Sequence, residues 1–470
     1  MVKDNYKRPR KGQHPMRHIY KYPASILACT TLLAGMTGTA AFGQHSAAVA
    51  RAASAQPSWP TFPSFTKDVT ITWWTFDDNP KNVVAAFNKV YPNIHVLTPL
   101  VGAGGAEYTK LLTVIKAGSG APDLVQIEYP ILPEFIATGG LLPITKYVGS
   151  YSKYFSPAVW NLVQSSDKVY ALPENVGPLG FMYRPDIYKK YGLTPPKTYS
   201  QLAADAAKLH AANPKMYYTF LDLNGGWDIT AYFWQAGAKL FSYQNGTWTV
   251  NINNSIDQKV LNFWGGLVKS GDVQATPTYT PQWESEVGNG LYASAIEAQW
   301  APQYMIGPYT KPATSNWAVA PLPQWDPARP LSADVQSATD AVTTQSKNPA
   351  AAALFDAWIH TSQAGVLWEE ETQGGAGVYS ANLNYPEMPQ FNIPISNLSG
   401  QHANPVWAQS QAEVDTNWQW SPWTTYYYSQ LSAELAKAAA GNETWDQVLA
   451  NVQNEVVTFA KEQGYQVRSS

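Results

Sequence analysis

The chain has 470 residues, which is enough for two or three domains or for one large fold with two lobes. Hydrophobic residues make up 45% of it and charged residues only 14%, which excludes a disordered chain and predicts a mainly uncharged surface. The net charge is −3, but residues 1–55 carry eight of the 31 lysines and arginines and one of the 34 acids, so the remainder is acidic. An acidic chain without a basic stripe argues against nucleic acid as a partner.

Residues 1–55 have the order of an export signal. A basic opening is followed by an uncharged, largely apolar stretch over 24–43 and by small residues up to Ala55. We therefore expect an exported protein, either periplasmic or at the outer face of the cell membrane. Retention of the signal as a membrane anchor is the alternative. The single cysteine, Cys29, follows Ile26-Leu27-Ala28 and resembles a bacterial lipid-attachment site, so lipidation is a further alternative to a plain signal cysteine.

A Pro/Ser-rich linker over 56–65 precedes the folded part. Alternating apolar residues predict strands, and apolar residues at helical spacing predict helices. In chain order these are a strand at 69–74, a helix at 80–90, a strand at 94–100, a helix at 107–117 and a strand at 123–127. Alternation of strands and helices indicates an α/β fold with a mainly parallel sheet.

The same alternation resumes after an irregular passage at 172–180. We expect a strand at 181–183 and helices at 185–191, 198–211, 256–269, 349–361, 424–440 and 444–462. Thr198 is the expected N-cap of the second of these helices. Two more irregular passages, at 321–330 and 374–377, interrupt the later half. Three such passages would suit three crossings between two lobes.

Several segments, in order, resemble the extracellular solute-binding proteins of ABC importers, in the carbohydrate-binding group that includes maltose-binding protein. They are FNKVYPNIHV at 87–96, the long segment KVYALPENVGPLGFMYRPDIYKKYGLTPPKTYSQLAADAAKL at 168–209, ASAIEAQWA at 293–301 and SKNPAAAALFDAWIHTSQ at 346–363. The resemblance covers roughly residues 69–460. Tyr183-Arg184-Pro185 and Glu297-Ala298-Gln299 depart from the family's usual Tyr-Asn-Lys and glycine-containing patterns.

The resemblance implies a periplasmic-binding-protein-like fold of two α/β lobes that close on a ligand by hinge motion. Its lobe boundaries would be 66–174 with 328–373, and 179–322 with 379–470. The hinge crossings would be 175–178, 323–327 and 374–378. The implied function is to bind a sugar or oligosaccharide and deliver it to a membrane permease, as a monomer without a cofactor.

Sugars present apolar C–H faces and a rim of hydroxyls, so a sugar site needs flat aromatic rings together with carboxylates and amides. Trp74, Asp77 and Asp78 follow the first strand, and Glu128 and Tyr129 follow the strand that ends at residue 127. Open α/β sheets bind ligands at these carboxyl ends of their strands. The competing interpretations are a helix cap for the two aspartates and a solvated loop for the second pair.

In the second half, Trp227 and Asp228 follow a Gly-Gly turn, and Glu297 and Trp300 lie on the element that lines the cleft in the family. Asp228 as a helix cap is the alternative to a contact. Four residues near the crossings complete the expected ligand-binding set, namely Asn175, Gly374, Gly375 and Tyr379.

Catalytic signatures are scarce. The seven histidines form no His-Glu-x-x-His pair, and no Gly-x-Ser-x-Gly motif occurs, so zincin and hydrolase-elbow chemistry lack support. Together with the resemblance, this leads us to expect a receptor and not an enzyme, without a metal site. Glu369-Glu370-Glu371 is expected to be a solvated helix end. Two alternatives stay open at this point: a secreted glycoside hydrolase, and the same receptor fold with a polyol or another non-sugar solute.

Overall fold

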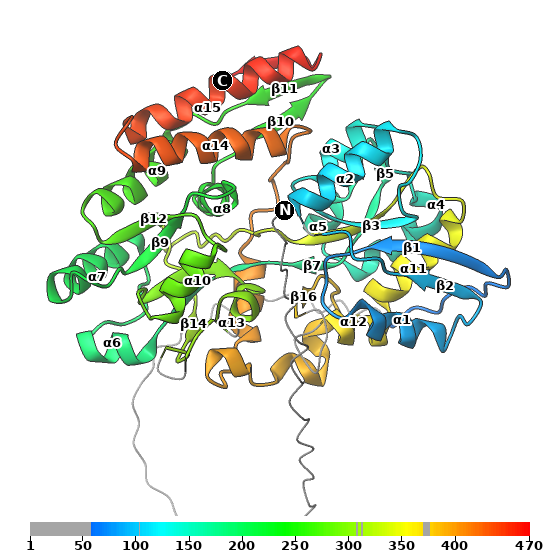
Figure 1. Cartoon of the computed structure of the whole chain (residues 1–470), viewed down its shortest axis with the longest axis horizontal. Helices are drawn as coiled ribbons and strands as arrows, with labels where there is room; N and C mark the ends of the chain where they lie inside the picture. Colours follow the sequence, from blue (N-terminus) through cyan, green and yellow to red (C-terminus); the bar gives the residue numbers. More distant parts are fainter. Residues whose placement is uncertain (1–57, 103, 307–308, 312–313, 370–376) are drawn as a thin grey trace, which may run out of the picture. The chain divides into compact units, whose positions relative to one another are not determined.

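The computed structural model describes residues 58–102, 104–306, 309–311, 314–369 and 377–470 (Figure 1). The predicted export signal and the residues predicted to be hinge contacts at 374 and 375 lie outside these ranges. Across the described residues, every helix is too short or too polar to span a bilayer.

The segment before the first strand is held against the fold by its backbone carbonyls. The Tyr154 hydroxyl donates to the carbonyl of Ser58 over 2.9 Å, and the Tyr91 hydroxyl donates to the carbonyl of Pro63 over 2.9 Å. Phe62 also stacks on Tyr151, with 6.1 Å between the ring centroids. A segment rich in proline cannot form a regular ladder, so side chains of the fold satisfy its carbonyls instead.

The first sheet has the strand order β2-β1-β3-β15-β6. Its strands are β1 (Val69–Trp74), β2 (Ile94–Leu97), β3 (Leu124–Glu128), β6 (Ala171–Pro173) and β15 (Ala338–Val342). β1 runs parallel to β2 and β3, whereas β15 is antiparallel to both β3 and β6. The α/β class is therefore confirmed, but this sheet is mixed, because β15, far along the chain from β3, runs in the direction opposite to it.

Helices pack around this sheet (Figure 1). They are α1 (Pro80–Asn88), α2 (Gly105–Lys116), α3 (Leu132–Ala137), α4 (Thr145–Val148), α5 (Pro157–Leu162), α11 (Pro349–Thr361) and α12 (Gln363–Glu369). A 3₁₀-helix covers Gly149–Tyr154, and a short hairpin joins β4 (Gln164–Ser165) to β5 (Lys168–Val169). Several of these helices begin at a proline, which fixes φ for the first turn and lacks only an N–H that would be unpaired there.

The first sheet and its helices are called here the first half, and the elements within 179–320 and 404–470 the second half; the second half has three smaller groups of strands. β8 (Leu179–Tyr183) lies antiparallel between β13 (Ser294–Ala298) and β14 (Ala318–Ala320), and β9 (Thr219–Asp222) pairs in parallel with β12 (Val273–Thr276). β10 (Phe241–Gln244) and β11 (Thr247–Val250) form a hairpin, and β17 (Val467–Ser469) adds in parallel to β11. This half is also a mixed arrangement and not a mainly parallel sheet.

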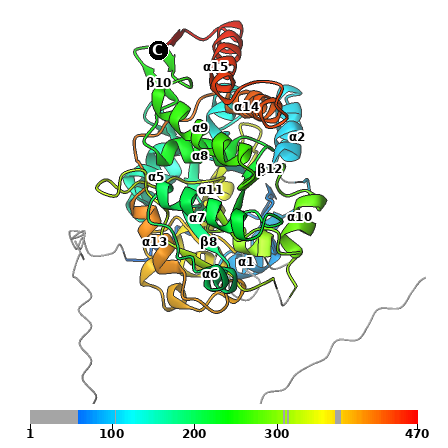
Figure 2. The same cartoon turned by 90° about the vertical axis from the view of Figure 1, so that its left-hand side faces the viewer.

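The helices of the second half are α6 (Pro185–Tyr191), α7 (Tyr199–Ala212), α8 (Trp227–Gln235), α9 (Ser255–Lys269), α10 (Pro281–Gly288), α13 (Asn404–Ala412), α14 (Thr424–Ala439) and α15 (Trp445–Glu462). A π-helix covers Pro302–Ile306, and short 3₁₀ turns cover Tyr385–Glu387, Pro389–Asn392 and Ser396–Leu398. α14 and α15 lie side by side in both views (Figures 1 and 2). Thr198 caps α7, as predicted, and accepts a hydrogen bond from the Gln201 N–H.

Two short strands join the halves near the middle of the molecule. β7 (Asn175–Val176) pairs in antiparallel fashion with β16 (Tyr379–Ser380). Their pairing brings the passage after Leu172 and Pro173 next to the passage that follows α12. Backbone pairing therefore holds these two passages together, with Asn175 opposite Ser380.

Tryptophan dominates the interior. Trp73, Trp264, Trp283, Trp317, Trp407 and Trp423 are all fully buried. Gly180 in β8 shows how tightly these rings pack, because a Cβ at this position would lie 2.0 Å from the Trp407 ring. Only glycine fits there, since protein interiors have no room for an added methyl group.

Candidate functional site

A cavity of about 510 Å³ lies between the two halves of the chain. The first half contributes Phe76 and Asp77 after β1, and Glu128 at the end of β3. The second half contributes Trp227 at the start of α8, together with residues that follow β12 and β13. Asn175 of β7 also lines the cavity, so side chains from both halves and from a crossing meet here.

Aromatic rings form most of the wall supplied by the second half. They are Trp227, Tyr279, Trp300, Tyr304 and Tyr309. The Trp300 indole N–H donates to the Val335 carbonyl over 3.0 Å, and its ring lies 6.0 Å from the Tyr279 ring and 6.0 Å from the Tyr304 ring, centroid to centroid. This bond and these ring contacts hold the Trp300 plane in a fixed orientation, as a stacking platform requires.

Three carboxyl groups line the cavity, namely those of Asp77, Glu128 and Glu284, and none of the lining residues in the described ranges is basic. Burial, together with the negative charges of Asp340 and Glu369, raises the pKa of Asp77 to about 7. Burial likewise raises the pKa of Glu128 to about 7. Near neutral pH these two groups can therefore act either as donors or as acceptors of hydrogen bonds.

A second set of acids lies behind the aromatic wall. Burial raises the pKa of Glu297 to about 8, with Asp222 as the next cause, and burial followed by the charges of Glu297 and Asp222 raises the pKa of Asp228 well above its usual value. Asp222 accepts hydrogen bonds from the backbone N–H groups of Asn224 and Thr278. Asp222 therefore orients the loops that precede Trp227 and Tyr279.

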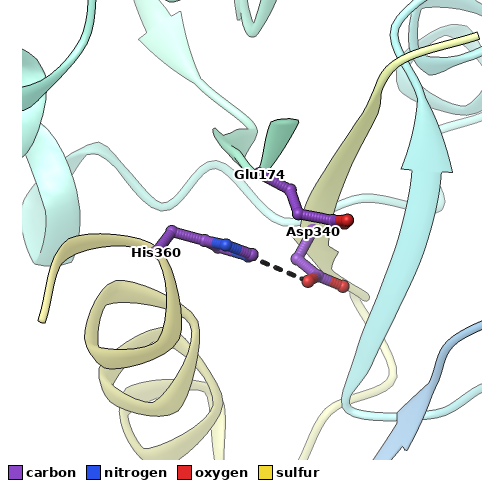
Figure 3. A group of neighbouring side chains, drawn as sticks. All are labelled: Glu174, Asp340 and His360. Carbon is purple, nitrogen blue, oxygen red and sulfur yellow. Dashed lines mark hydrogen bonds and ion pairs between the residues drawn. The ribbon is translucent and has the colours of Figure 1, made fainter. Parts of the chain in front are cut away.

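A buried histidine, His360, lies beside the carboxyl groups of Asp340 and Glu174 (Figure 3). His360 Nε2 lies 3.0 Å from an oxygen of Asp340, and its Nδ1 lies 2.6 Å from an oxygen of Glu369. Burial alone would lower the pKa of His360, but the hydrogen bonds to Asp340 and Glu369 raise it well above its ordinary value. Glu369 is fully buried, so the expectation of a solvated helix end is wrong for this residue: its partner is the His360 ring and not water.

Ligand atoms of Glu174, Asp340 and His360 lie within 4.8 Å of one another, a spacing that a metal ion could use. Each of these groups already has hydrogen-bond partners. Both oxygens of Glu174 accept from amides, those of Gln126 and Asn175, and the Trp73 indole N–H donates to Asp340 over 2.8 Å. The cluster is thus a hydrogen-bonded network, which connects through Gln126 and Asn175 to the cavity wall.

Five of the predicted site residues line the cavity, and they come from both halves and from one crossing. They are Asp77, Glu128, Asn175, Trp227 and Trp300. Asp78 is exposed beside the cavity and accepts a hydrogen bond from the Gln303 amide over 3.1 Å. Neither aspartate caps α1, whose N-cap is Asn79.

Other predicted contacts are buried next to the cavity and do not line it. Trp74 is 5% exposed, and the Lys110 ammonium lies 4.6 Å from its ring centroid. The Tyr129 hydroxyl donates to the Asn175 carbonyl over 3.2 Å, and Tyr379 is buried in β16. Asp228 and Glu297 belong to the acids behind the aromatic wall. Whether any of these residues touches ligand stays a prediction.

The sequence-based prediction missed Phe76, Tyr279, Glu284, Tyr304 and Tyr309. Tyr279 follows the carboxyl end of β12, so the rule that selected Asp77 and Glu128 could also have found it. It has a positive φ of 53°, an unfavourable conformation for tyrosine that turns the chain toward the cavity.

Comparisons with known proteins agree with this architecture. An arabinooligosaccharide-binding protein of Halalkalibacterium halodurans is 24% identical over 305 residues, which cover 62% of this chain and 67% of the relative. An ABC transporter-associated binding protein of B. animalis subsp. lactis, solved with β-1,6-galactobiose, is 27% identical with a TM-score of 0.75, over 86% of this chain and 100% of that one. The galacto-N-biose/lacto-N-biose I-binding protein of Bifidobacterium longum is 21% identical with a TM-score of 0.73, over the same shares.

These solved structures have the two-lobed fold expected from the sequence, with an α/β sheet system in each lobe. The family model described as "Bacterial extracellular solute-binding protein" matches residues 73–366. That range covers both halves of the cavity and more than half of the chain, and the protein therefore belongs to the bacterial extracellular solute-binding protein family.

Proposed function

We propose that this protein is the exported sugar-binding component of an ABC importer, which holds an uncharged saccharide in the cavity and delivers it to a membrane permease. The observation that carries the proposal is the lining of the cavity: stacking rings on one wall, carboxyl and amide groups on the other, and no basic side chain among the described lining residues. Aromatic rings pack on the C–H faces of a sugar, and carboxyl and amide groups bind its hydroxyls.

The size and charge of the cavity favour a neutral di- or oligosaccharide. Its volume of about 510 Å³ lies within the usual range of ligand pockets. A phosphorylated or carboxylated sugar would meet Asp77, Glu128 and Glu284 with no arginine or lysine to pair with. The names of the similar proteins, which include arabinooligosaccharide and galactobiose ligands, support the same class.

We assign the two lobes the boundaries expected from the sequence, with crossings at 175–178, 323–327 and 374–378. The return of β15 to the first sheet and the pairing of β7 with β16 support three crossings. Ligand that touches both lobes favours their closed arrangement, because it gains contacts there that the open arrangement lacks. The closed monomer would then be the form that the permease recognises.

A hydrolase would need two carboxyl groups at a fixed separation, roughly 5–9.5 Å depending on mechanism. The carboxyl groups of this cavity come from elements of different lobes, with Asp77 and Glu128 in one and Glu284 in the other. The separation of Glu284 from either of the other two would change with every opening and closing, and Asp77 and Glu128 are the one pair that shares a lobe; the similar proteins named above are binding proteins. We therefore assign the cavity to binding and not to catalysis.

Thermal melting of the purified protein with β-1,6-galactobiose, arabinotriose and galacturonic acid tests the proposal, with product analysis of the same samples. A neutral sugar at about 100 times its Kd should add roughly 2.7 kcal/mol to the free energy of unfolding, and the acid should add nothing. Trp227→Ala should weaken binding about tenfold, whereas Trp227→Phe should keep most of it, because a ring remains. Cleaved product, or binding of the acid alone, would overturn the proposal.

A further inference from the structure

A second cavity, of about 470 Å³, lies away from the first and shares no lining residue with it. It is lined by residues of α3, α5 and the β4–β5 turn on one side, and of the β10–β11 hairpin and the chain at 418–422 and 464–466 on the other. In the proposed division these sides belong to lobe one and lobe two. The proposed function makes no use of this cavity.

Aromatic side chains supply much of its wall. Tyr243 and Trp248 lie on the hairpin, with ring centroids 5.1 Å apart, and Trp418 and Trp420 lie opposite, with centroids 5.2 Å apart and planes inclined by 77°. Tyr243 is 49% exposed, so a large part of this residue is accessible to a ligand. Rings set at different angles can face both sides of a bent chain of sugar rings.

The rest of the lining mixes apolar residues, such as Ile136, Leu162 and Pro422, with uncharged polar ones. It includes the side chains of Asn161, Gln164, Ser166 and Gln466, and none of the lining residues is acidic or basic. An ion entering this cavity would lose hydration without gaining a counter-charge, whereas hydroxyl groups would find amide and hydroxyl partners. The lining therefore selects an uncharged ligand that has both apolar faces and hydroxyls.

Trp418 forms a rigid part of this wall. The residue is 7% exposed, and its indole N–H has no hydrogen-bond acceptor among the described residues. Its ring stacks on Trp234 at 4.7 Å with planes inclined by 10°, so it cannot easily turn to find one. A buried unpaired donor costs about 1–3 kcal/mol, and the ring also borders a small cavity beside Trp234.

A hydrogen bond and a tight turn order the two sides of the cavity wall. The Tyr243 N–H donates to the Gln419 side-chain oxygen over 2.9 Å, which ties the hairpin to the segment that carries Trp418 and Trp420. On the other side, Ser166 and Asp167 join β4 to β5. Both have positive φ, as the two central residues of a tight hairpin turn require. A wall that is already ordered loses little entropy when it binds.

We propose that this cavity is a second binding site for an uncharged oligosaccharide, separate from the site of the proposed function. Because its walls come from both lobes, a sugar bound here changes the free energy of lobe movement. Any such effect on the first site must be reciprocal, so each sugar alters the affinity for the other by the same factor.

Native mass spectrometry and equilibrium dialysis with arabinotriose and β-1,6-galactobiose test the proposal. The wild-type protein should bind two sugar molecules per chain. Tyr243→Ala should bind one, because it removes an exposed ring and leaves the core intact, whereas Tyr243→Phe should still bind two. Trp300→Ala, in the first site, should lose the other molecule and keep the one that depends on Tyr243.

The outcomes separate this proposal from the proposed function. Binding of one molecule that Trp300→Ala abolishes and Tyr243→Ala leaves unchanged would overturn the second site and keep the first. Binding that Tyr243→Ala abolishes while Trp300→Ala has no effect would support the second site and overturn the assignment of the first. Protection of residues 243–248 from hydrogen exchange by sugar, in the Trp300→Ala variant, would locate the second molecule directly.

Discussion

Glu107 offers a sharp test of how buried acids set the stability of this fold. It lies in the first turn of α2, its side chain is fully buried, and neither of its carboxyl oxygens has a hydrogen-bond partner among the described residues. Burial raises its pKa from 4.5 to about 8, with further contributions from the charges of Asp340 and Asp77. The folded protein therefore keeps this carboxyl group protonated at pH values where the unfolded chain has lost the proton.

The direction of the pH effect follows from these two pKa values. The folded-state pKa of Glu107 is raised, so its contribution is fully present below pH 4.5 and is lost as the pH rises toward 8. Over that window the free energy of unfolding falls by about 1.4 kcal/mol per pH unit from this group. Between pH 5 and pH 7 the loss is roughly 3 kcal/mol. The positive end of α2 favours the ionised form, but by only about 1 kcal/mol, so burial dominates.

Glu107→Gln removes the titration and keeps the shape of the side chain. We expect the variant and the wild type to be about equally stable at pH 4, and the variant to be more stable by roughly 3 kcal/mol at pH 7. Urea unfolding at pH 4, 5.5 and 7 measures the difference, provided that the dependence on urea concentration is the same for both proteins. Glu462→Gln, on the exposed end of α15, is the matched control because no burial is relieved there. Parallel pH profiles for wild type and Glu107→Gln would refute the argument.

Two further predictions concern packing and the buried histidine. Gly180→Ala should destabilise the fold by about 1–3 kcal/mol, because the added methyl group meets a tryptophan ring, whereas Gly266→Ala, where nothing lies within 4 Å of the new Cβ, should stabilise α9 by roughly 0.5–1 kcal/mol. Equal effects in thermal melting would contradict this assignment. Asp340→Asn should cost about 3–5 kcal/mol, because it removes a carboxylate that accepts from His360. Asp356→Asn should cost much less, since its carboxyl group lies 3.5 Å from His360 Nε2 and neither of its oxygens has a hydrogen-bond partner among the described residues. If Asp356→Asn lost more free energy of unfolding than Asp340→Asn in urea, the carboxylate that stabilises His360 would be that of Asp356 and not that of Asp340.

The sequence by itself determined the local elements and the family. Helices α6 and α11 have the predicted bounds, and α7 begins one residue after the Thr198 that was expected to cap it. Proline at a first turn, a capping hydroxyl and apolar spacing act over a few residues, so they can be read without the fold. The ordered motifs also identified the family, which the match over residues 73–366 establishes.

Only the tertiary structure decided which of these residues share an environment. Trp74 and Asp77 follow the same strand, yet the first is buried beside Lys110 and the second lines the cavity. Glu369 was expected in solvent because its sequence neighbours are acids, but α12 carries it to His360 in the interior. Burial, and with it the pKa of each acid, depends on contacts between distant segments, and strand direction depends on where the chain returns, as β15 does. Neither is encoded in a local pattern.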